Sequence, residues 1–135
     1  MRIILSVAAL LLSTNTAFSA PIYVSHSGDD LVGQRLTYGL REAIAKSAQH
    51  RIVYAEKDAA FSIFLVTVKN GDDPVTSYSA VLTIPQPSGK GLNYYVTSVA
   101  GNCGSSRIPS CADNIMAMFD DDITSIIQAI RQLQN

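Results

Sequence analysis

The chain has 135 residues, of which 47% are hydrophobic and 16% are charged, and its formal net charge is −1. This length suffices for one domain with a sizeable core and is too short for two. The near-neutral balance, without a run of Lys and Arg, argues against nucleic acid as the main partner, because neutralising phosphates takes clustered cations.

The first 19 residues have the three-part layout of a secretory signal peptide. Arg2 supplies the positive start, residues 3–12 are apolar, and Ala17 and Ser19 are the small residues before the expected cleavage site. The apolar run is shorter than the roughly 20 residues that span a bilayer, and no later segment is long and apolar enough to do so. We therefore expect residues 20–135 to form one exported domain, periplasmic or secreted. Without the positive charge of Arg2, its net charge changes from −1 to −2.

The first third of this domain predicts a strand, a helix and a second strand. Residues 21–27 alternate between apolar and polar positions, as in a strand with one buried face, and residues 27–30 suit a turn and a helix N-cap. Residues 31–49 carry apolar side chains at helical spacing. Residues 51–55 then predict a short strand, followed by a polar turn at residues 56–58.

The rest of the chain predicts three strands and a closing helix. Residues 61–69 and 75–84 are rich in β-branched and aromatic residues, and the turn NGDDP between them predicts a hairpin. Two prolines and two glycines at residues 85–91 predict a loop, and residues 92–100 predict the last strand. The closing helix should begin at Pro109 or Ser110 and end near Leu133.

The expected order is therefore β-α-β-β-β-β-α, which makes the chain an α+β protein. Each helix has an apolar stripe that needs a surface to pack on, and a single sheet can supply it. We expect one mostly antiparallel sheet with both helices packed on one face, and with the hairpin exposing part of the other face.

The two cysteines of the chain, Cys103 and Cys111, are predicted to form a disulfide bond. An exported chain meets an oxidising compartment, where paired thiols tend to join. Seven residues separate the pair, whereas redox motifs usually have two, and a zinc site needs four donors. Two alternatives stay open. One is a labile redox pair, because Cys111 lies near a helix start, and the other is a metal site. No metal or cofactor is otherwise predicted.

Polar clusters elsewhere favour ordinary structural roles. The three acids of Asp120–Asp122 would fan around a helix and could not converge on one cation. The stretch Ser88–Gly91 lacks the full phosphate-loop pattern and precedes a strand. His50 follows the first helix, where a cation suits the C-terminal dipole.

One stretch brings Ser, His and Asp close together in the sequence, which is the residue set of a hydrolytic site. His26 lies between Ser25 and Ser27, and Asp29 and Asp30 follow. Adjacent strand residues point to opposite faces, so Ser25 and His26 should not bond through their side chains. We therefore predict that the chain is not an enzyme.

An aromatic surface is the best candidate for partner binding. Tyr94 and Tyr95 lie on the last strand, and Tyr78 lies on the strand that faces it. Because neighbours in a strand alternate between faces, one of Tyr94 and Tyr95 should lie in the core and the other should point outward. Arg107, in the cysteine loop, is a further candidate contact.

Two parts of the sequence resemble known groups of exported proteins. The pattern of residues 31–84, with Leu36, Leu40, Ile44, Val53 and Val81 among its matching positions, resembles the N-terminal domain of TolB-like periplasmic proteins. The β-propeller that follows that domain in TolB is absent here. The loop Cys103–Ile108 is similar to one in a group of small exported bacterial proteins, which indicates no activity. The first resemblance implies a protein-binding domain of the cell envelope, a likeness of fold from which little about function follows.

The sequence thus predicts a non-enzymatic periplasmic or secreted binding or accessory domain with one disulfide. Its partner would be an envelope or secreted protein that contacts an exposed sheet edge or the outward face of the hairpin. A small envelope redox protein or enzyme that uses Cys103 and Cys111 is one alternative. A secreted inhibitor or immunity protein is another. The oligomeric state is left undetermined.

Overall fold

The computed structural model describes residues 19–72, 74–88 and 91–135. It contains β1 (Ala20–Ser27), α1 (Leu31–Lys46), β2 (His50–Val53), the 3-10 turn η1 (Glu56–Asp58), β3 (Phe61–Lys69), β4 (Val75–Pro85), β5 (Asn93–Gly104) and α2 (Ile108–Leu133). This is the β-α-β-β-β-β-α order expected from the sequence, and the α+β class is confirmed. The signal-peptide prediction falls almost wholly on residues 1–18, outside the described residues.

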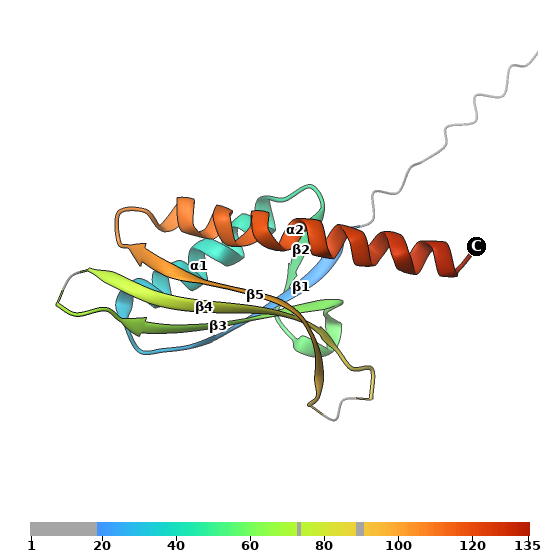
Figure 1. Cartoon of the computed structure of the whole chain (residues 1–135), viewed down its shortest axis with the longest axis horizontal. Coiled ribbons are helices and arrows are strands. Elements are labelled where there is room, and N and C mark those ends of the chain that lie inside the picture. Colours follow the sequence, from blue (N-terminus) through green and yellow to red (C-terminus); the bar gives the residue numbers. More distant parts are fainter. Residues whose placement is uncertain (1–18, 73, 89–90) are drawn as a thin grey trace, which may run out of the picture.

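All five strands belong to one sheet, in the order β2-β1-β3-β4-β5 (Figure 1). β1 runs parallel to β2, because α1 carries the chain back along the sheet between them. β1 also runs parallel to β3, because the segment that contains η1 returns the chain a second time between β2 and β3. The β3–β4 and β4–β5 ladders are antiparallel and longer, so the sheet is mostly antiparallel. The predicted hairpin is the β3–β4 pair.

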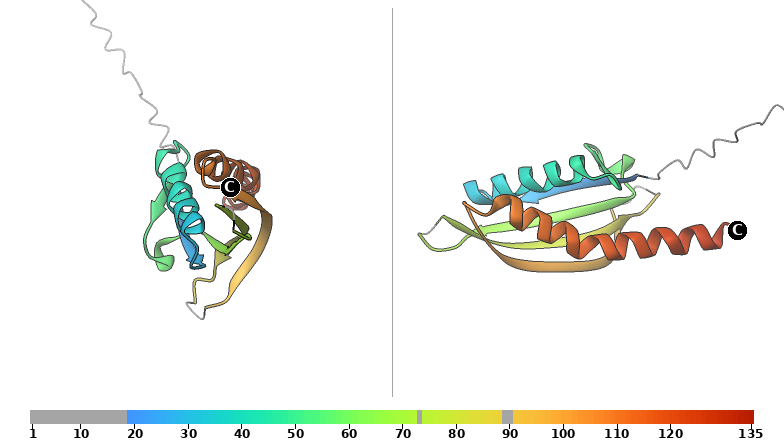
Figure 2. Two further views of the ribbon diagram at one scale, coloured as in Figure 1. Left: turned by 90° about the vertical axis from the view of Figure 1, so that its left-hand side faces the viewer. Right: turned by 90° about the horizontal axis from the view of Figure 1, so that it is seen from above.

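Both helices cover the same face of the sheet, as Figure 2 shows. Along β1 the buried residues Ala20, Ile22 and Val24 alternate with more exposed ones, as in a strand with one face in the core. The core between the sheet and the helices is made of fully buried apolar side chains. The largest are Phe119, Ile22, Leu36, Leu40, Ile44, Ile63, Leu65, Leu82, Ile115 and Ile123.

A buried hydrogen-bond network holds the start of α1 on the sheet. Asp30 is the N-cap of α1, and its carboxylate accepts from the Gly33 N–H at 2.7 Å. The same carboxylate accepts from the Thr67 hydroxyl of β3 at 2.8 Å. Gly33 lies against Thr67, so the absence of a side chain at Gly33 is what lets the helix approach β3 this closely. One carboxylate therefore caps the helix and fixes its distance from the sheet.

The substitution Gly33→Ala should destabilise the protein by about 2 kcal/mol, an overpacking cost. Helix propensity alone predicts the opposite, a gain of about 1 kcal/mol. A Cβ at this position would collide with the Thr67 hydroxyl and lie 2.6 Å from the Asp30 carboxylate. Gly39→Ala, whose new Cβ would lie 2.9 Å from a methyl group of Ile108 and at ordinary contact distance from its other neighbours, should cost less. Urea unfolding of both variants measures the difference, and a more stable Gly33→Ala protein would contradict the account.

His50 departs from its expected role as a cation at the end of α1. It is the first residue of β2 and is only 5% exposed, and its Nε2 lies 2.6 Å from Asp120 Oδ1 on α2. Ser47 is the C-cap of α1 instead. The His50–Asp120 contact ties β2 to α2, so one member of the three-acid run of α2 has a structural partner.

Candidate functional site

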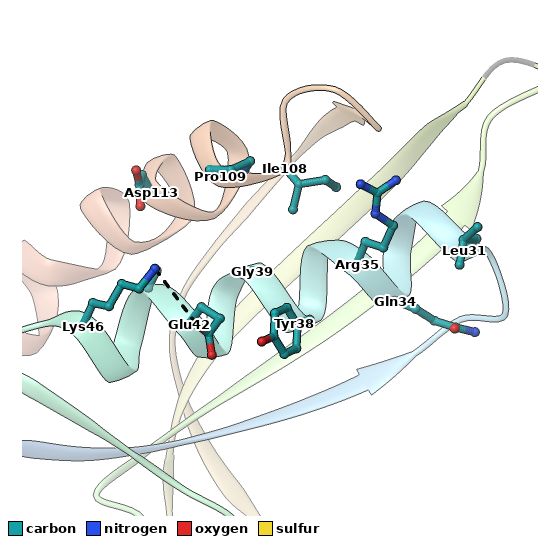
Figure 3. A pocket seen from close by; sticks show the side chains of 11 residues that line it. Leu31, Gln34, Arg35, Tyr38, Gly39, Glu42, Lys46, Ile108, Pro109 and Asp113 are labelled. Carbon is teal, nitrogen blue, oxygen red and sulfur yellow. Dashed lines mark ion pairs between the residues drawn. The ribbon is translucent and has the colours of Figure 1, made fainter.

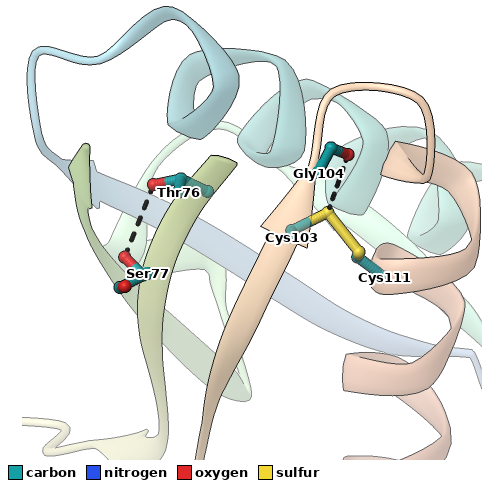
Figure 4. The surroundings of a disulfide bond; sticks show 5 residues. All are labelled: Thr76, Ser77, Cys103, Gly104 and Cys111. Atoms are coloured by element: carbon teal, nitrogen blue, oxygen red, sulfur yellow. Dashed lines mark hydrogen bonds between the residues drawn. A yellow bond between two sulfur atoms is a disulfide. The ribbon is translucent and has the colours of Figure 1, made fainter. Parts of the chain in front are cut away.

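The disulfide predicted from the sequence is present, between Cys103 and Cys111, with the two Cα atoms 6.1 Å apart. Figure 4 shows that it joins the end of β5 to the first turn of α2. β5 extends four residues beyond the predicted end of the last strand and includes Cys103. Cys103 is 1% exposed and Cys111 is 9% exposed. Because an attacking thiolate must reach a sulfur along the S–S axis, burial on both sides favours a structural bond over an exchanging one.

Replacing both Cys103 and Cys111 by Ser should lower the melting temperature by roughly 10 °C. Closing a loop of about nine residues is worth about 2.5 kcal/mol in the chain-entropy description. Reduction of the unmodified protein should produce a shift of similar size, measured by thermal unfolding with and without a reductant. Equal melting temperatures for the oxidised and reduced forms would contradict a stabilising role.

The tyrosines do not form the aromatic patch that the sequence suggested. Tyr78 pairs with Gly101 on β5 and packs, half-buried, against the core on the helix side. Tyr94 and Tyr95 are 59% and 67% exposed, so neither is a core residue. They pair with the far end of β4, at Ile84 and Thr83, beyond a register shift at Leu82/Thr83. The prediction that one of Tyr94 and Tyr95 lies in the core is therefore wrong, because both side chains are exposed.

The sheet face opposite the helices carries exposed and half-buried apolar side chains. We call it the open face and define it by Phe64, Val66, Val68, Val81 and Tyr95. Phe64 is paired with Val81, and Val66 and Val68 continue the same face of β3 at 48% and 63% exposure. The helices lie on the other side of the sheet (Figure 2).

β5 is one edge of the sheet, and its regular part, Thr97–Gly104, is here called the β5 edge. The whole strand is 12 residues long and contains neither a charged residue nor a proline. Its side chains are small along the regular part, and Cys103 is the one residue of β5 that is buried. Native proteins usually block long edges with charges, prolines or coverings, so an unblocked edge of this length is a natural strand-pairing surface.

The direction of the backbone groups along the β5 edge follows from one hydrogen bond. The Ser105 N–H donates to the Pro74 carbonyl at 2.9 Å, which places residue 105 among those that bond to β4. Backbone groups alternate in an antiparallel ladder, so Ser98, Ala100 and Asn102 direct their N–H and C=O groups away from β4. The side chains of the same three residues are exposed.

The opposite edge of the sheet is much smaller. β2 has four residues, His50–Val53, and one of them is the exposed cation Arg51. A short edge strand with a charge is the protected form that natural sheets use. The two edges of this sheet therefore differ in their capacity to accept another strand.

A groove of about 670 Å³ lies between α1 and the first turn of α2. Figure 3 shows Tyr38 on the α1 side, with Ile108 and Pro109 on the α2 side. The exposed Tyr38 and Leu31 contribute apolar surface, and Lys46 and Glu42 form an ion pair at 4.0 Å on its rim. Arg107 is exposed and precedes α2 as its N-cap residue, without a side-chain capping bond.

The Ser, His and Asp residues near the end of β1 do not assemble into a hydrolytic site. His26 Nε2 lies 2.8 Å from the Thr67 hydroxyl, which in turn donates to Asp30. Thr67 thus stands between the imidazole and the carboxylate, and its proton is committed to Asp30. Ser25 lies on the neighbouring position of β1 and has no hydrogen bond to His26. The structure brings His26 and Asp30 together through a β3 residue that the sequence could not indicate.

Asp30 keeps its negative charge in this buried network. Burial raises the pKa of Asp30, but the hydrogen bonds from the Thr67 hydroxyl and the Gly33 N–H outweigh it, and the pKa lies below the ordinary value of 3.8. A carboxyl with a lowered folded-state pKa contributes stability above its unfolded pKa, and this contribution is lost as the pH falls through the folded pKa.

The variant Asp30→Asn should therefore flatten the acid limb of the stability profile. We expect it to be less stable than the parent by about 1 kcal/mol at pH 7, since bonds to a charged acceptor are the stronger ones. The difference should shrink from about pH 4 downward, as the parent carboxyl becomes protonated. Urea unfolding at intervals of roughly half a pH unit between about pH 3 and pH 7 measures this difference in stability. Asp29→Asn is the matched control and should keep the slope of the parent, and a parallel loss in both variants would contradict the assignment.

The described residues contain no group of three or more His, Cys, Asp or Glu side chains placed to hold a metal ion. In the same part of the chain, none of the helices combines the length and apolar character of a membrane span.

The chain matches no protein-family description and none of the curated proteins. Its fold is similar to the crystal structure of protein XCC0632 from Xanthomonas campestris, a DUF330 protein. The two share 7% sequence identity with a TM-score of 0.47, over 88% of this chain and 90% of that chain. A likeness this weak carries no argument about function. The resemblance to TolB-like proteins stays a prediction.

Proposed function

We propose that this chain is an exported, non-enzymatic binding domain that accepts an extended segment of another envelope or secreted protein along the β5 edge. The observation that carries the proposal is the length and chemistry of β5, the strand that contains this edge, which has 12 residues with no charge and no proline. Ser98, Ala100 and Asn102 offer outward backbone groups, and main-chain pairing of this kind supplies affinity in strand addition.

The chemistry of the partner follows from the surface it would extend. A strand added beside β5 would place alternate side chains on the open face, directly next to the small side chains of Ser98, Ala100 and Asn102, with Val81 of β4 one strand further in. A partner segment with β-branched or aromatic residues at alternate positions fits this face. It would carry few charges, because β5 offers none to pair with them.

Export is supported by the leader-like residues 1–19 and by the disulfide. The Cys103–Cys111 bond is a feature of oxidising compartments, and Ala20, the first residue after the expected cleavage site, is the first residue of β1. The redox alternative gains no support from a disulfide with both sulfurs buried. Nothing in the fold specifically favours an inhibitor or immunity protein.

The test is a photo-crosslinking amino acid placed at Ser98 in the exporting host, with one at Arg51 as the matched position on the opposite edge. We expect a discrete adduct with one protein from position 98 and none from position 51. Adding Ala100→Pro to the chain should reduce the adduct about tenfold or more, because proline removes an outward N–H and crowds the incoming strand.

Several outcomes would overturn the proposal. These are equal adducts from positions 98 and 51, an adduct that Ala100→Pro does not reduce, or an adduct of two copies of this chain. Since the Ala100 N–H makes no bond to β4, Ala100→Pro should lower the free energy of unfolding by only on the order of 1 kcal/mol. Its melting temperature should therefore stay within a few degrees of that of the parent. In hydrogen exchange, the amides of Ser98, Ala100 and Asn102 should become protected in the complex, while that of Val99 is protected with or without the partner.

A further inference from the structure

A polar hollow lies beside β1, where the neighbouring strand ends early. β2 pairs with β1 only from Ala20 to Tyr23, whereas β1 continues to Ser27. The second half of β1 is therefore covered by α1 but has no strand on that side among the described residues. A hollow of about 370 Å³ opens at this step, lined by Tyr23, Ser25 and His26 of β1 and by Gln34, Thr37 and Arg41 of α1, with the Val24 backbone between them.

Arg41 gives this hollow a permanent positive charge. Its Nη2 donates to the Val24 carbonyl at 3.1 Å, which holds the half-buried guanidinium against the strand. Arg41 makes no ion pair within the described residues, and no Asp or Glu lines the hollow. A guanidinium has five N–H donors, and the structure accounts for one of them by a hydrogen bond. The carboxylate of Asp30, at the start of the same helix, is bonded to the Thr67 hydroxyl and the Gly33 N–H.

His26 is held in one orientation by the network below the hollow. Since the Thr67 hydroxyl gives its proton to Asp30, the 2.8 Å contact between Thr67 and His26 requires a proton on His26 Nε2. The other ring nitrogen, Nδ1, makes no hydrogen bond within the described residues and, unlike Nδ1 of His50, is not a buried unpartnered atom. This nitrogen is therefore the one left for a ligand.

We propose that the hollow is a binding site for a small polar carboxylate, whose oxygens contact the Arg41 guanidinium and Nδ1 of protonated His26. The planar fork of Arg matches the two oxygens of a carboxylate. One fixed cation and one titrating imidazole suit a single negative charge. Ser25 and Gln34 line the same hollow and supply partners for hydroxyl groups on the ligand, so a hydroxylated acid fits better than a purely apolar one.

The proposal carries a definite pH dependence. Burial lowers the pKa of His26, the Asp30 carboxylate acts in the opposite direction, and the Arg41 guanidinium lowers it again, so His26 is neutral at pH 7. These are the charged groups that face His26, from the loop before α1 and from α1 itself. A neutral Nδ1 presents a lone pair to the anion, whereas a protonated one donates a hydrogen bond. Carboxylate binding should therefore strengthen as the pH falls and His26 takes up a proton, until its titration is complete.

The test uses the full mature chain and three probes, namely galacturonate, its neutral counterpart galactose, and inorganic phosphate. Titration followed by NMR or calorimetry should show galacturonate binding at the hollow, and galactose should not bind there. The variant Arg41→Gln should weaken galacturonate about tenfold or more, the change expected on losing a charge-assisted bond. Arg35→Gln, a matched change on a different face of α1, should leave the affinity unaltered.

The pH arm tests His26 directly. The parent should bind galacturonate more tightly at pH 5 than at pH 8, and His26→Gln should remove most of this difference while keeping the fold, as checked by its melting temperature. The inference is overturned if galacturonate fails to bind, if galactose binds equally well, if phosphate binds more tightly than galacturonate, or if Arg41→Gln and Arg35→Gln behave alike. The experiment does not involve the β5 edge, so its outcome is independent of the proposed function.

Discussion

The arrangement of this domain depends on the two hydrogen bonds of the Thr67 hydroxyl, one to Asp30 and one to His26. They join β3 to the capping residue of α1 and to the end of β1. Because the carboxylate is buried and charged, its bonds cannot be given up without leaving an unsatisfied acceptor in the core. The position of α1 over the sheet is therefore set at its first turn, and the apolar stripe of the helix then meets the strands in a defined register.

The second helix, α2, is held by a covalent bond. α2 begins four residues after β5 ends, and the Cys103–Cys111 bond holds that turn closed. The Thr67–Asp30 hydrogen bond and the disulfide hold α1 and α2 on one face of the sheet, which Figure 2 shows. The other face and the β5 edge are not covered by the helices. Groups that could perform chemistry are used in holding the fold: His26 and Asp30 share Thr67, and His50 is bonded to Asp120.

The parts of the fold that depend on local pattern were predictable from the sequence. Alternation along residues 61–69 and 75–84 indicated the hairpin, and the cysteine pair in a chain expected to be exported indicated the disulfide. Strand order was not predictable, because whether β1 lies at an edge or inside the sheet is decided by long-range packing. For the same reason the partner of His50 was missed: Asp120 is 70 residues away.

The tyrosines show a further limit of pattern analysis. Alternation assumes a regular strand covered on one face along its whole length. At Tyr94 and Tyr95 neither condition holds, because the ladder has a register shift at Leu82/Thr83 and both side chains remain exposed. Thr67 was likewise invisible as a network member, since a threonine in a β-rich segment carries no sign of which carboxylate it will meet. The hollow beside Arg41 arises from the difference in length between β1 and β2, which only the pairing register reveals.

The inequality of the two sheet edges has a consequence for assembly. Polymerisation through a sheet requires each unit to present two receptive margins, one for the unit before it and one for the unit after it. Here one margin is a four-residue strand with a charged residue, and the other is 12 residues of neutral backbone. If the proposed pairing takes place along β5, the short and charged β2 strand offers no comparable second site on the same chain, so this pairing alone would not link copies of the chain into a continuous sheet.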